Sequence, residues 1–516
     1  MSNTVKKNKS INEHERNKEY VKRTTSRKLN RFQEYTTINF AWGASLILFF
    51  ILLFNGYNII DKTVNQGLLL FSFIYLAEGI IQFIISAALK KEIIEGSEIK
   101  KSTRIKGYLM ILFVLSGNIF SAIAGFTLIK KKKTIEYTIS IYMFLVSICI
   151  MLVSALNLFK DNVADTFMIG MGILFANALF YLFCMIMAGK YSDSKNVDKR
   201  IIPIVVILIL TSITGNIFAL LLASVLISKY RHKDKETAVE WIDIVNRLFR
   251  NNMSVIGVFV IVFLISLSLC SYLTFDYSIA VENNYSAILQ KPNIKYPFGT
   301  DNFGRCAFSR IVFGARISLI IGIAVTVLPM FMGGMLGAVS GYYGGKLDNA
   351  IMRFMDVLYA VPSILLAIAI IASFGTSTFN LVMALSVGSI AVYARTVRAT
   401  VMSISSSEYV EAARACGAKD ILIIVKHIIP NSLAPIIVRA TMGIGTAVLS
   451  TSSLSYLGLG VEPHIPEWGN VLRIGSMYLE TNPYLAIFPG LAIITIVLAF
   501  NFFGDGLRDA LDPKLK

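Results

Sequence analysis

Long apolar blocks alternate with short polar stretches along almost the whole chain. A helix of about 20 residues crosses the hydrocarbon core of a bilayer, and most of these blocks approach or exceed that length. The pattern predicts an all-α integral membrane protein, with about six hydrophobic segments ahead of a core of six helices. The blocks lie near residues 39–55, 66–89, 107–129, 136–158, 164–189 and 201–228, and then 253–275, 315–340, 352–373, 378–394, 433–459 and 484–503.

The two groups of blocks are separated by a charged stretch in which Trp241, Ile244 and Leu248 recur at helical spacing. This spacing favours an amphipathic elbow helix. The first residues are polar and basic over a length that does not fit a cleaved signal peptide. The predicted parts are a basic cytoplasmic tail (1–35), an N-terminal membrane module (36–235), the elbow helix (236–252) and a C-terminal membrane domain (253–516).

The N-terminal module contains a short internal repeat. Leu115-Ser-Gly-Asn-Ile-Phe120 matches Ile213-Thr-Gly-Asn-Ile-Phe218 at an offset of 98 residues. The same offset brings the first hydrophobic block onto the fourth. We therefore expect the module to be an internal duplication.

Charge placement leaves two topologies open for blocks 107–129 and 201–228. If each block crosses the membrane once, Lys130–Lys133 falls outside, against the tendency of basic loops to stay in the cytoplasm. Each block also carries Gly-Asn near its middle. If both are re-entrant hairpins that turn there, every basic cluster lies inside, provided that protein or water covers the irregular backbone.

Composition supports a membrane protein and adds little chemistry. Hydrophobic residues make up 55% of the 516 residues, charged residues 16%, and the net charge is +17. The basic residues flank apolar blocks, as cytoplasmic loops do, so we expect no nucleic-acid partner. The five cysteines lie far apart without metal-ligand or redox spacing, and they are interpreted as separate thiols.

The most informative polar segment is residues 403–430, between two apolar blocks. Ser405 and Glu408 have the spacing of a capping box, which predicts the start of a helix. Gly417 can adopt positive φ and end that helix. A second helix is expected from about Lys419, and Pro430 is expected to stop it.

The first of these helices has a small, acidic face. Glu411 falls in an early turn, where the helix dipole favours negative charge. Ala412 and Ala413 leave a flat surface that another chain can approach closely. The segment is therefore predicted to form a helix–turn–helix that projects into the cytoplasm.

Glu411-Ala412-Ala413, Gly417 and Pro430 resemble the EAA motif of ABC importer permeases, and His427 before the final Pro-Asn is typical of the oligopeptide/dipeptide/nickel family. The resemblance is to the partner permease with a long N-terminal extracellular segment, and it covers roughly residues 240–516. A departure is Cys306, where the family usually has Asp. Further matching stretches are Phe298–Asp301, Gly304-Arg305, Ser309-Arg310, Gly314–Arg316, Gly341–Gly345, Asp356–Pro362, Ser455–Gly460, Glu467–Asn470 and Gly504–Pro513.

The resemblance implies a type I importer permease core that forms half of a translocation pore. It implies four kinds of partner: a second homologous permease, two ABC ATPase subunits, an extracellular substrate-binding lipoprotein and the lipid bilayer. It places the chain in the bacterial plasma membrane as a multi-pass subunit without catalytic, cofactor or metal sites. The residues implied in ATPase coupling are Glu408, Glu411, Ala412, Ala413, Gly417, His427, Pro430 and Asn431.

The chain lacks a phosphate-binding loop of its own, so ATP hydrolysis is expected on separate chains. Gly341-Tyr-Tyr-Gly-Gly-Lys346 looks similar but continues with Leu347. Gly333, Gly337 and Gly341 repeat every four residues, which instead favours close helix packing.

Three functions fit this sequence. The first is permease-mediated import of di- or oligopeptides. The second is the same role for nickel, a metal chelate or another small solute, because a fold does not fix its ligand. The third is a membrane scaffold or sensor, against which the intact EAA segment argues.

Several polar residues stand apart from these motifs. Glu78 and Asn177 lie within apolar blocks, and one interpretation is that both line a site. The interpretation we favour for Glu78 is a protonated side chain packed against a neighbouring helix. Residues 276–312 and 461–482 are expected outside. His464 and Glu467 are metal-binding residue types, but two such residues are weak evidence for a metal site, and we expect them to lie in a solvated loop. The basic residues Arg305, Arg310 and Arg316 would then lie outside as well, against the positive-inside tendency.

Overall fold

The structure is a computed structural model, and it describes residues 29, 32–58, 63–64, 66–96, 98–130, 134–160, 163–190, 201–231 and 240–512. Most of the predicted cytoplasmic tail lies outside these residues, and so do residues 131–133 of the Lys130–Lys133 cluster. Contacts divide the chain into two compact units. The first comprises Met1–Leu145 with Tyr181–Asn196, and the second Val146–Phe180 with Val197–Lys516.

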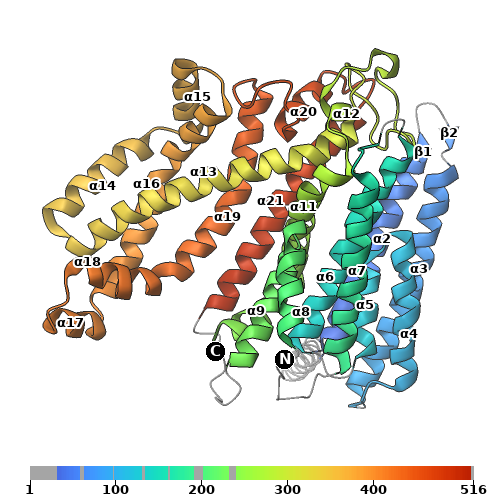
Figure 1. The fold of residues 1–516 in the computed structure, drawn as a ribbon, viewed down its shortest axis with the longest axis horizontal. Coiled ribbons are helices and arrows are strands. Elements are labelled where there is room, and N and C mark those ends of the chain that lie inside the picture. Colours follow the sequence, from blue (N-terminus) through green and yellow to red (C-terminus); the bar gives the residue numbers. More distant parts are fainter. Residues whose placement is uncertain are drawn as a thin grey trace, which may run out of the picture. The chain divides into compact units, whose positions relative to one another are not determined.

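The first unit begins with two long apolar helices, α2 and α3, which pack against each other (Figure 1). Two very short antiparallel strands connect them, with Tyr57 opposite Val64. The elements are α2 (Gln33–Gly56), β1 (Tyr57–Asn58), β2 (Thr63–Val64), α3 (Gln66–Ile94), α4 (Lys101–Leu112), the 3₁₀ turn η1 (Phe113–Ser116) and α5 (Ile119–Ile129).

Block 107–129 is a helical hairpin. The chain reverses at Gly117, which has φ of 84°. Asn118 is the N-cap of α5, and its side chain accepts a hydrogen bond from the Ser121 N–H. The two arms touch through glycines: a Cβ on Gly107 would lie 2.8 Å from the Gly125 carbonyl oxygen. With 12 and 11 residues, α4 and α5 are each too short to cross a bilayer, at about 1.5 Å per residue.

Block 201–228 has the same form in the second unit. It comprises α8 (Ile201–Thr211), the 3₁₀ turn η3 (Ser212–Thr214) and α9 (Ile217–Arg231), with Gly215 at φ of 85°. The structure therefore supports the hairpin alternative for both blocks. Glycine accepts positive φ at both turns, and at the first turn Asn118 also caps the helix that follows.

Element order repeats along the module. The helices α6 (Ile135–Ala155), extended by the 3₁₀ turn η2 (Leu156–Phe159), and α7 (Phe167–Lys190) precede the second hairpin, as α2 and α3 precede the first. The predicted duplication would produce this order.

Nine helices of the described residues are long and apolar enough to cross a membrane, four of them in the module. The remaining elements are α10 (Glu240–Leu248), α11 (Asn252–Thr274), α12 (Ser278–Val281), η4 (Tyr285–Ala287), α13 (Ala307–Tyr343), α14 (Gly345–Ala360), α15 (Ser363–Phe374), α16 (Thr378–Ser405), α17 (Glu408–Ala415), α18 (Asp420–Ile423), the π turn η5 (Ile424–Ile428), α19 (Ile429–Tyr456), α20 (Trp468–Ser476) and α21 (Tyr484–Leu511).

The predicted block at 352–373 is not one continuous helix. The chain bends by 84° between α14 and α15. Val361 precedes Pro362 and has an extended conformation, with φ of −87° and ψ of 126°. The proline ring disfavours helical backbone at the preceding residue, so the helix breaks there.

The expected glycine packing is confirmed between α13 and α16. A Cβ on Gly333, Gly337 or Gly341 would lie 2.4, 2.3 or 2.8 Å from a carbonyl oxygen of α16. These oxygens belong to Ile390, Ala394 and Arg398. The backbones of α13 and α16 therefore approach so closely at these glycines that even a Cβ atom would not fit between them.

Candidate coupling site

The EAA residues lie on α17, a short helix between the long helices α16 and α19. In Figure 1, α17 and α18 lie at the C-terminal end of α13, whereas α12 lies near its N-terminal end. Tyr342 ties α13 to this region, because its hydroxyl donates a hydrogen bond of 2.7 Å to Asp420 Oδ1. The Arg414 guanidinium lies 5.5 Å from the centre of the Tyr342 ring.

The predicted capping box is wrong. Ser405 is the last residue of α16, and its hydroxyl donates to the Met402 carbonyl, as serines within helices often do. α17 begins at Glu408 with Ser407 as its N-cap, which makes no side-chain capping bond. The N-cap of α17 thus lies two residues later than the capping pattern suggested.

The predicted positive φ at Gly417 is confirmed. Its φ is 80°, and the N–H groups of Gly417 and Ala418 donate to the carbonyls of Arg414 and Ala413, closing the end of α17. A Cβ placed on Gly417 would meet no atom within 4 Å. A side chain at this position would therefore clash with no other part of the chain. The positive φ of the backbone is what favours glycine here.

Pro430 does not stop the second helix, contrary to expectation. The helical path runs from Asp420 to Tyr456 through the π turn Ile424–Ile428. Proline lacks the N–H that an α-helix needs, and a locally widened turn accommodates that loss. The Asn431 amide also donates to the His427 carbonyl at 2.6 Å.

The knob formed by residues 405–430 has a buried apolar side and an exposed side. Val410, Ile423 and Ile428 are fully buried in a cluster with Val397 and Val401 of α16. This packing holds the knob against the long helices. Glu408, Glu411, Ala412, Cys416 and Gly417 are exposed, and Ala413 is half-buried.

Sequence reasoning missed an exposed apolar strip beside the EAA residues. Ile421 is 71% exposed, Val425 59% and Leu422 49%. The apolar run Ile421–Val425 signalled a helix core, but only Ile423 and Ile424 are buried. The structure does not join His427, Pro430 and Asn431 to α17 by hydrogen bonds; among the described residues, His427 and Asn431 bond to each other.

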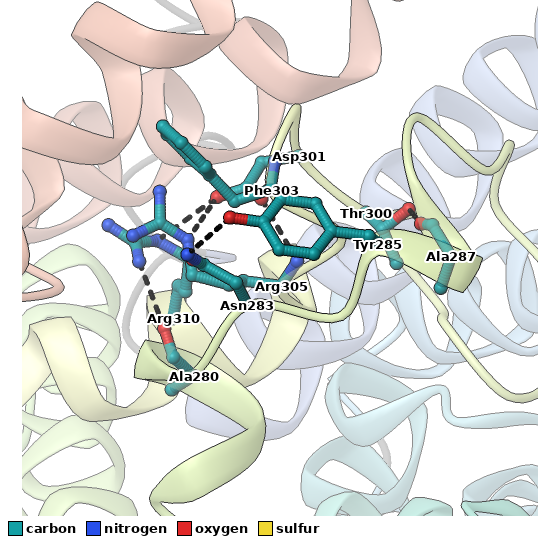
Figure 2. Close-up of polar contacts among 9 residues, drawn as sticks. All are labelled: Ala280, Asn283, Tyr285, Ala287, Thr300, Asp301, Phe303, Arg305 and Arg310. Carbon is teal, nitrogen blue, oxygen red and sulfur yellow. Dashed lines mark hydrogen bonds and ion pairs between the residues drawn. The ribbon is translucent and has the colours of Figure 1, made fainter.

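The predicted outer segment, residues 276–312, contains a buried charge cluster (Figure 2). Asp301 accepts a bond of 2.8 Å from Arg305 Nε, and Arg310 Nε lies 3.8 Å from the same carboxylate oxygen. Arg310 also donates to the Ala280 carbonyl at 2.9 Å. Arg316 lies over the Tyr272 ring. These contacts give the three arginines local partners, although the positive-inside tendency did not explain their predicted position on the outer side.

A lysine that follows the module helix α6 contacts the same segment. Lys160 Nζ donates a bond of 2.7 Å to Ser309 Oγ and lies 5.3 Å from the centre of the Phe275 ring. Burial lowers the pKa of Lys160, because it penalises the charged ammonium. Lys160 also lines a cavity of about 220 Å³.

The expectation that Glu467 lies in a solvated loop is wrong. It is fully buried and caps α20, accepting bonds from the N–H groups of Gly469 and Asn470. Its other oxygen accepts from Ser318 and Ser452. A structural role in joining α13, α19 and α20 explains its position, and no group of metal-binding side chains occurs among the described residues.

Comparison with known proteins gives a consistent answer. Residues 333–516 match the family described as binding-protein-dependent transport system inner membrane component. The dipeptide transport system permease protein DppC of Alkalihalophilus pseudofirmus is 44% identical over 285 residues, which is 55% of this chain and 93% of that protein. This chain belongs to the family of binding-protein-dependent ABC importer permeases.

A second relative agrees. The glutathione transport system permease protein GsiD of Pectobacterium atrosepticum is 41% identical over 284 residues, covering 55% of this chain and 94% of that protein. Among solved structures, an inward-facing MetNI methionine ABC transporter has 20% identity and a TM-score of 0.34, covering 39% of this chain and 97% of the other.

The chain is therefore a multi-pass transporter subunit of the plasma membrane. It is not an enzyme, and ATP hydrolysis belongs to a separate subunit. Permeases of this family work with a second permease, ATPases and a substrate-binding protein.

Proposed function

We propose that this permease imports di- or oligopeptides, forming half of a pore with a second homologous permease. Two ATPase subunits and an extracellular substrate-binding lipoprotein complete the transporter. The relatives named for dipeptide and glutathione transport support the peptide class. The core domain proposed for this role is 253–516, and module 36–235 is an addition to it.

The knob is proposed as the ATPase contact. The observation that carries this proposal is exposure on two contacting helices of the knob: Glu411 and Ala412 are exposed on α17, and so is the apolar strip Ile421, Leu422 and Val425, which begins on α18. A contiguous exposed apolar strip beside charged residues is typical of a protein interface. In this proposal His427, Pro430 and Asn431 contribute by shaping the π turn that sets the direction of α19.

The proposed mechanism follows from how the knob is attached. It continues directly into α16 and α19, and the Tyr342–Asp420 hydrogen bond joins it to α13. A displacement of the knob by a closing ATPase pair would therefore move three long helices together. This is rigid-body motion of the kind used in alternating access.

The native cysteines allow a direct test of the contact. Cys416 is exposed, and Cys149, Cys184, Cys270 and Cys306 are buried. We expect a charged maleimide to label the native subunit at Cys416, and addition of the ATPase subunits to slow that labelling about tenfold or more, because an interface excludes the reagent. Mass spectrometry of the labelled peptide measures both rates.

Cys416→Ser is the control, and it should remove nearly all rapid labelling. An unchanged labelling rate in the assembled transporter would contradict the proposed contact. Labelling of Cys416 in intact cells from outside would contradict the proposed cytoplasmic side.

The substrate class has a separate test. In a strain that lacks this chain, uptake of a labelled dipeptide should fall to background and return when the chain is restored. Nickel uptake should be unchanged. Loss of nickel uptake with normal dipeptide uptake would reverse the assignment of cargo, and it would leave the coupling proposal intact.

A further inference from the structure

A buried polar cluster lies inside the first unit, at the tip of hairpin α4–α5. Its members come from α2, α3 and the hairpin, and all are at most 4% exposed. Polar side chains buried among membrane helices are costly, so they are retained for packing specificity or for function. The cluster consists of Ser45, Glu78, Gln82, Asn118 and Ser121.

Hydrogen bonds connect the cluster into a network. Asn118 Nδ2 donates to Glu78 Oε2 at 2.7 Å and to Ser45 Oγ at 2.8 Å. Gln82 accepts from Ser45 and donates to Ser121, both at 3.0 Å. Glu78 therefore binds the turn of the hairpin to α3.

The other carboxyl oxygen of Glu78 reports its protonation state. Ser116 Oγ lies 2.5 Å from Glu78 Oε1 and 2.7 Å from the Phe113 carbonyl oxygen. A hydroxyl has one hydrogen, and a carbonyl oxygen only accepts. If Glu78 were ionised, one of these two short oxygen–oxygen contacts would contain no hydrogen. If Oε1 carries a proton, Glu78 donates to Ser116 and Ser116 donates to Phe113.

The surroundings supply no compensating charge. Among the described residues, no Lys, Arg or His forms an ion pair with Glu78. α2 and the hairpin contribute only neutral groups to its network, namely the hydroxyl and amide groups already described. Tyr75 of α3 is the titratable neighbour, and its hydroxyl donates to the Ser116 carbonyl at 3.0 Å. The protonated carboxyl is the form that this site accommodates.

The second repeat shows that a hairpin turn forms without this carboxyl. At the same offset of 98, the glycine and asparagine of the turn persist as Gly215 and Asn216. Glu78 corresponds to Ala176, Gln82 to Phe180, Ser45 to Met143 and Ser121 to Ala219. Asn177 is buried one position beyond the equivalent of Glu78 and carries no charge at any pH.

We propose that Glu78 is a proton-binding site, occupied in the native state, that latches the tip of hairpin α4–α5 to α3. Loss of the proton to water leaves a carboxylate whose Oε1 can no longer donate to Ser116. If Ser116 keeps donating to the Phe113 carbonyl, the carboxylate is repelled by the lone pairs of the Ser116 oxygen. If Ser116 instead donates to the carboxylate, its hydrogen bond to Phe113 is lost. The latch opens, and residues 113–121 separate from α3.

Hydrogen exchange of the full-length subunit in lipid nanodiscs tests this proposal, after correction for the intrinsic pH dependence of exchange. Coupling to the loss of one proton makes the opening constant of residues 113–121 rise about tenfold per pH unit, over the pH range in which Glu78 is ionised in the opened hairpin and protonated in the closed one. The second hairpin, residues 211–219, is the internal control and should show no such dependence.

Variants separate the proton from simple packing. Glu78→Gln should keep the hairpin protected at every pH, because its amide donates to Ser116 as the protonated carboxyl does. Ser116→Ala retains the carboxyl but removes its acceptor, and it should shift the loss of protection to lower pH. Ser116→Ala keeps the test valid if Glu78→Gln does not fold.

Two outcomes would overturn the proposal. One is protection of residues 113–121 that does not change between about pH 5 and about pH 9 in the native chain. The other is protection that follows Na⁺ concentration at constant pH, which would make the cluster a site for a metal cation instead of a proton.

Discussion

Replacing Gly417 by Asp is expected to abolish uptake while the subunit still folds and inserts. No atom lies within 4 Å of the position of the new Cβ, and Asp adopts positive φ more readily than most residues. The defect therefore falls on the ATPase contact. Burying an unpaired charge at an interface costs about 2–5 kcal/mol, which weakens subunit association about 30-fold or more.

Gly417→Asn is the matched control, because it has nearly the same size and tolerance of positive φ without the charge. It should retain more uptake than Gly417→Asp. The measurements are peptide uptake, the amount of subunit in the membrane and protection of Cys416 by the ATPases. Normal uptake in Gly417→Asp would refute the coupling role of the knob.

Substitution by alanine at two glycines of α13, Gly337 and Gly334, is expected to change the stability of the subunit in opposite directions. A Cβ on Gly337 would lie 2.3 Å from the Ala394 carbonyl oxygen, so α13 and α16 must move apart in Gly337→Ala. Overpacking of this kind costs about 1–3 kcal/mol. A Cβ on Gly334 would meet only Val397, at 4.0 Å. Gly334→Ala should therefore stabilise the helix by up to about 1 kcal/mol.

Thermal unfolding of the purified subunit, followed by labelling of its buried cysteines, measures both effects. Gly337→Ala should lower the midpoint, and Gly334→Ala should leave it unchanged or raise it. Equal midpoints for the two variants would show that α13 and α16 do not approach as closely as described.

Local sequence patterns predicted the helical elements well. The apolar blocks became single helices, a bent pair or hairpins, and the Gly-Asn pairs marked both hairpin turns. The choice between hairpin and single crossing was not decided by hydropathy, because both fit the same apolar length. It depended on whether the two arms of each block pack together, as they do in the first block where Gly107 meets Gly125.

Two of the failures are local, and two arise from contacts with distant residues. Ser405 had the sequence of an N-cap, but it is the last residue of the preceding helix. Pro430 looked like a terminator, but a π turn removes the conflict. Glu467 looked solvated because its serine partners are 15 and 149 residues away. The partner of Glu78 was equally hidden, since Asn118 is 40 residues further along the chain.

The length of α13 has a consequence for how signals cross the bilayer. Its 37 residues span about 55 Å, from near Asp301 at one end to Tyr342 at the other. If this helix couples the ATPase contact to the docking site of the substrate-binding protein, the coupling is reciprocal. The factor by which nucleotide binding changes the affinity for the substrate-binding protein equals the factor by which that protein changes the affinity for nucleotide. The affinity of the assembled transporter for ATP should therefore depend on whether its loaded receptor is present.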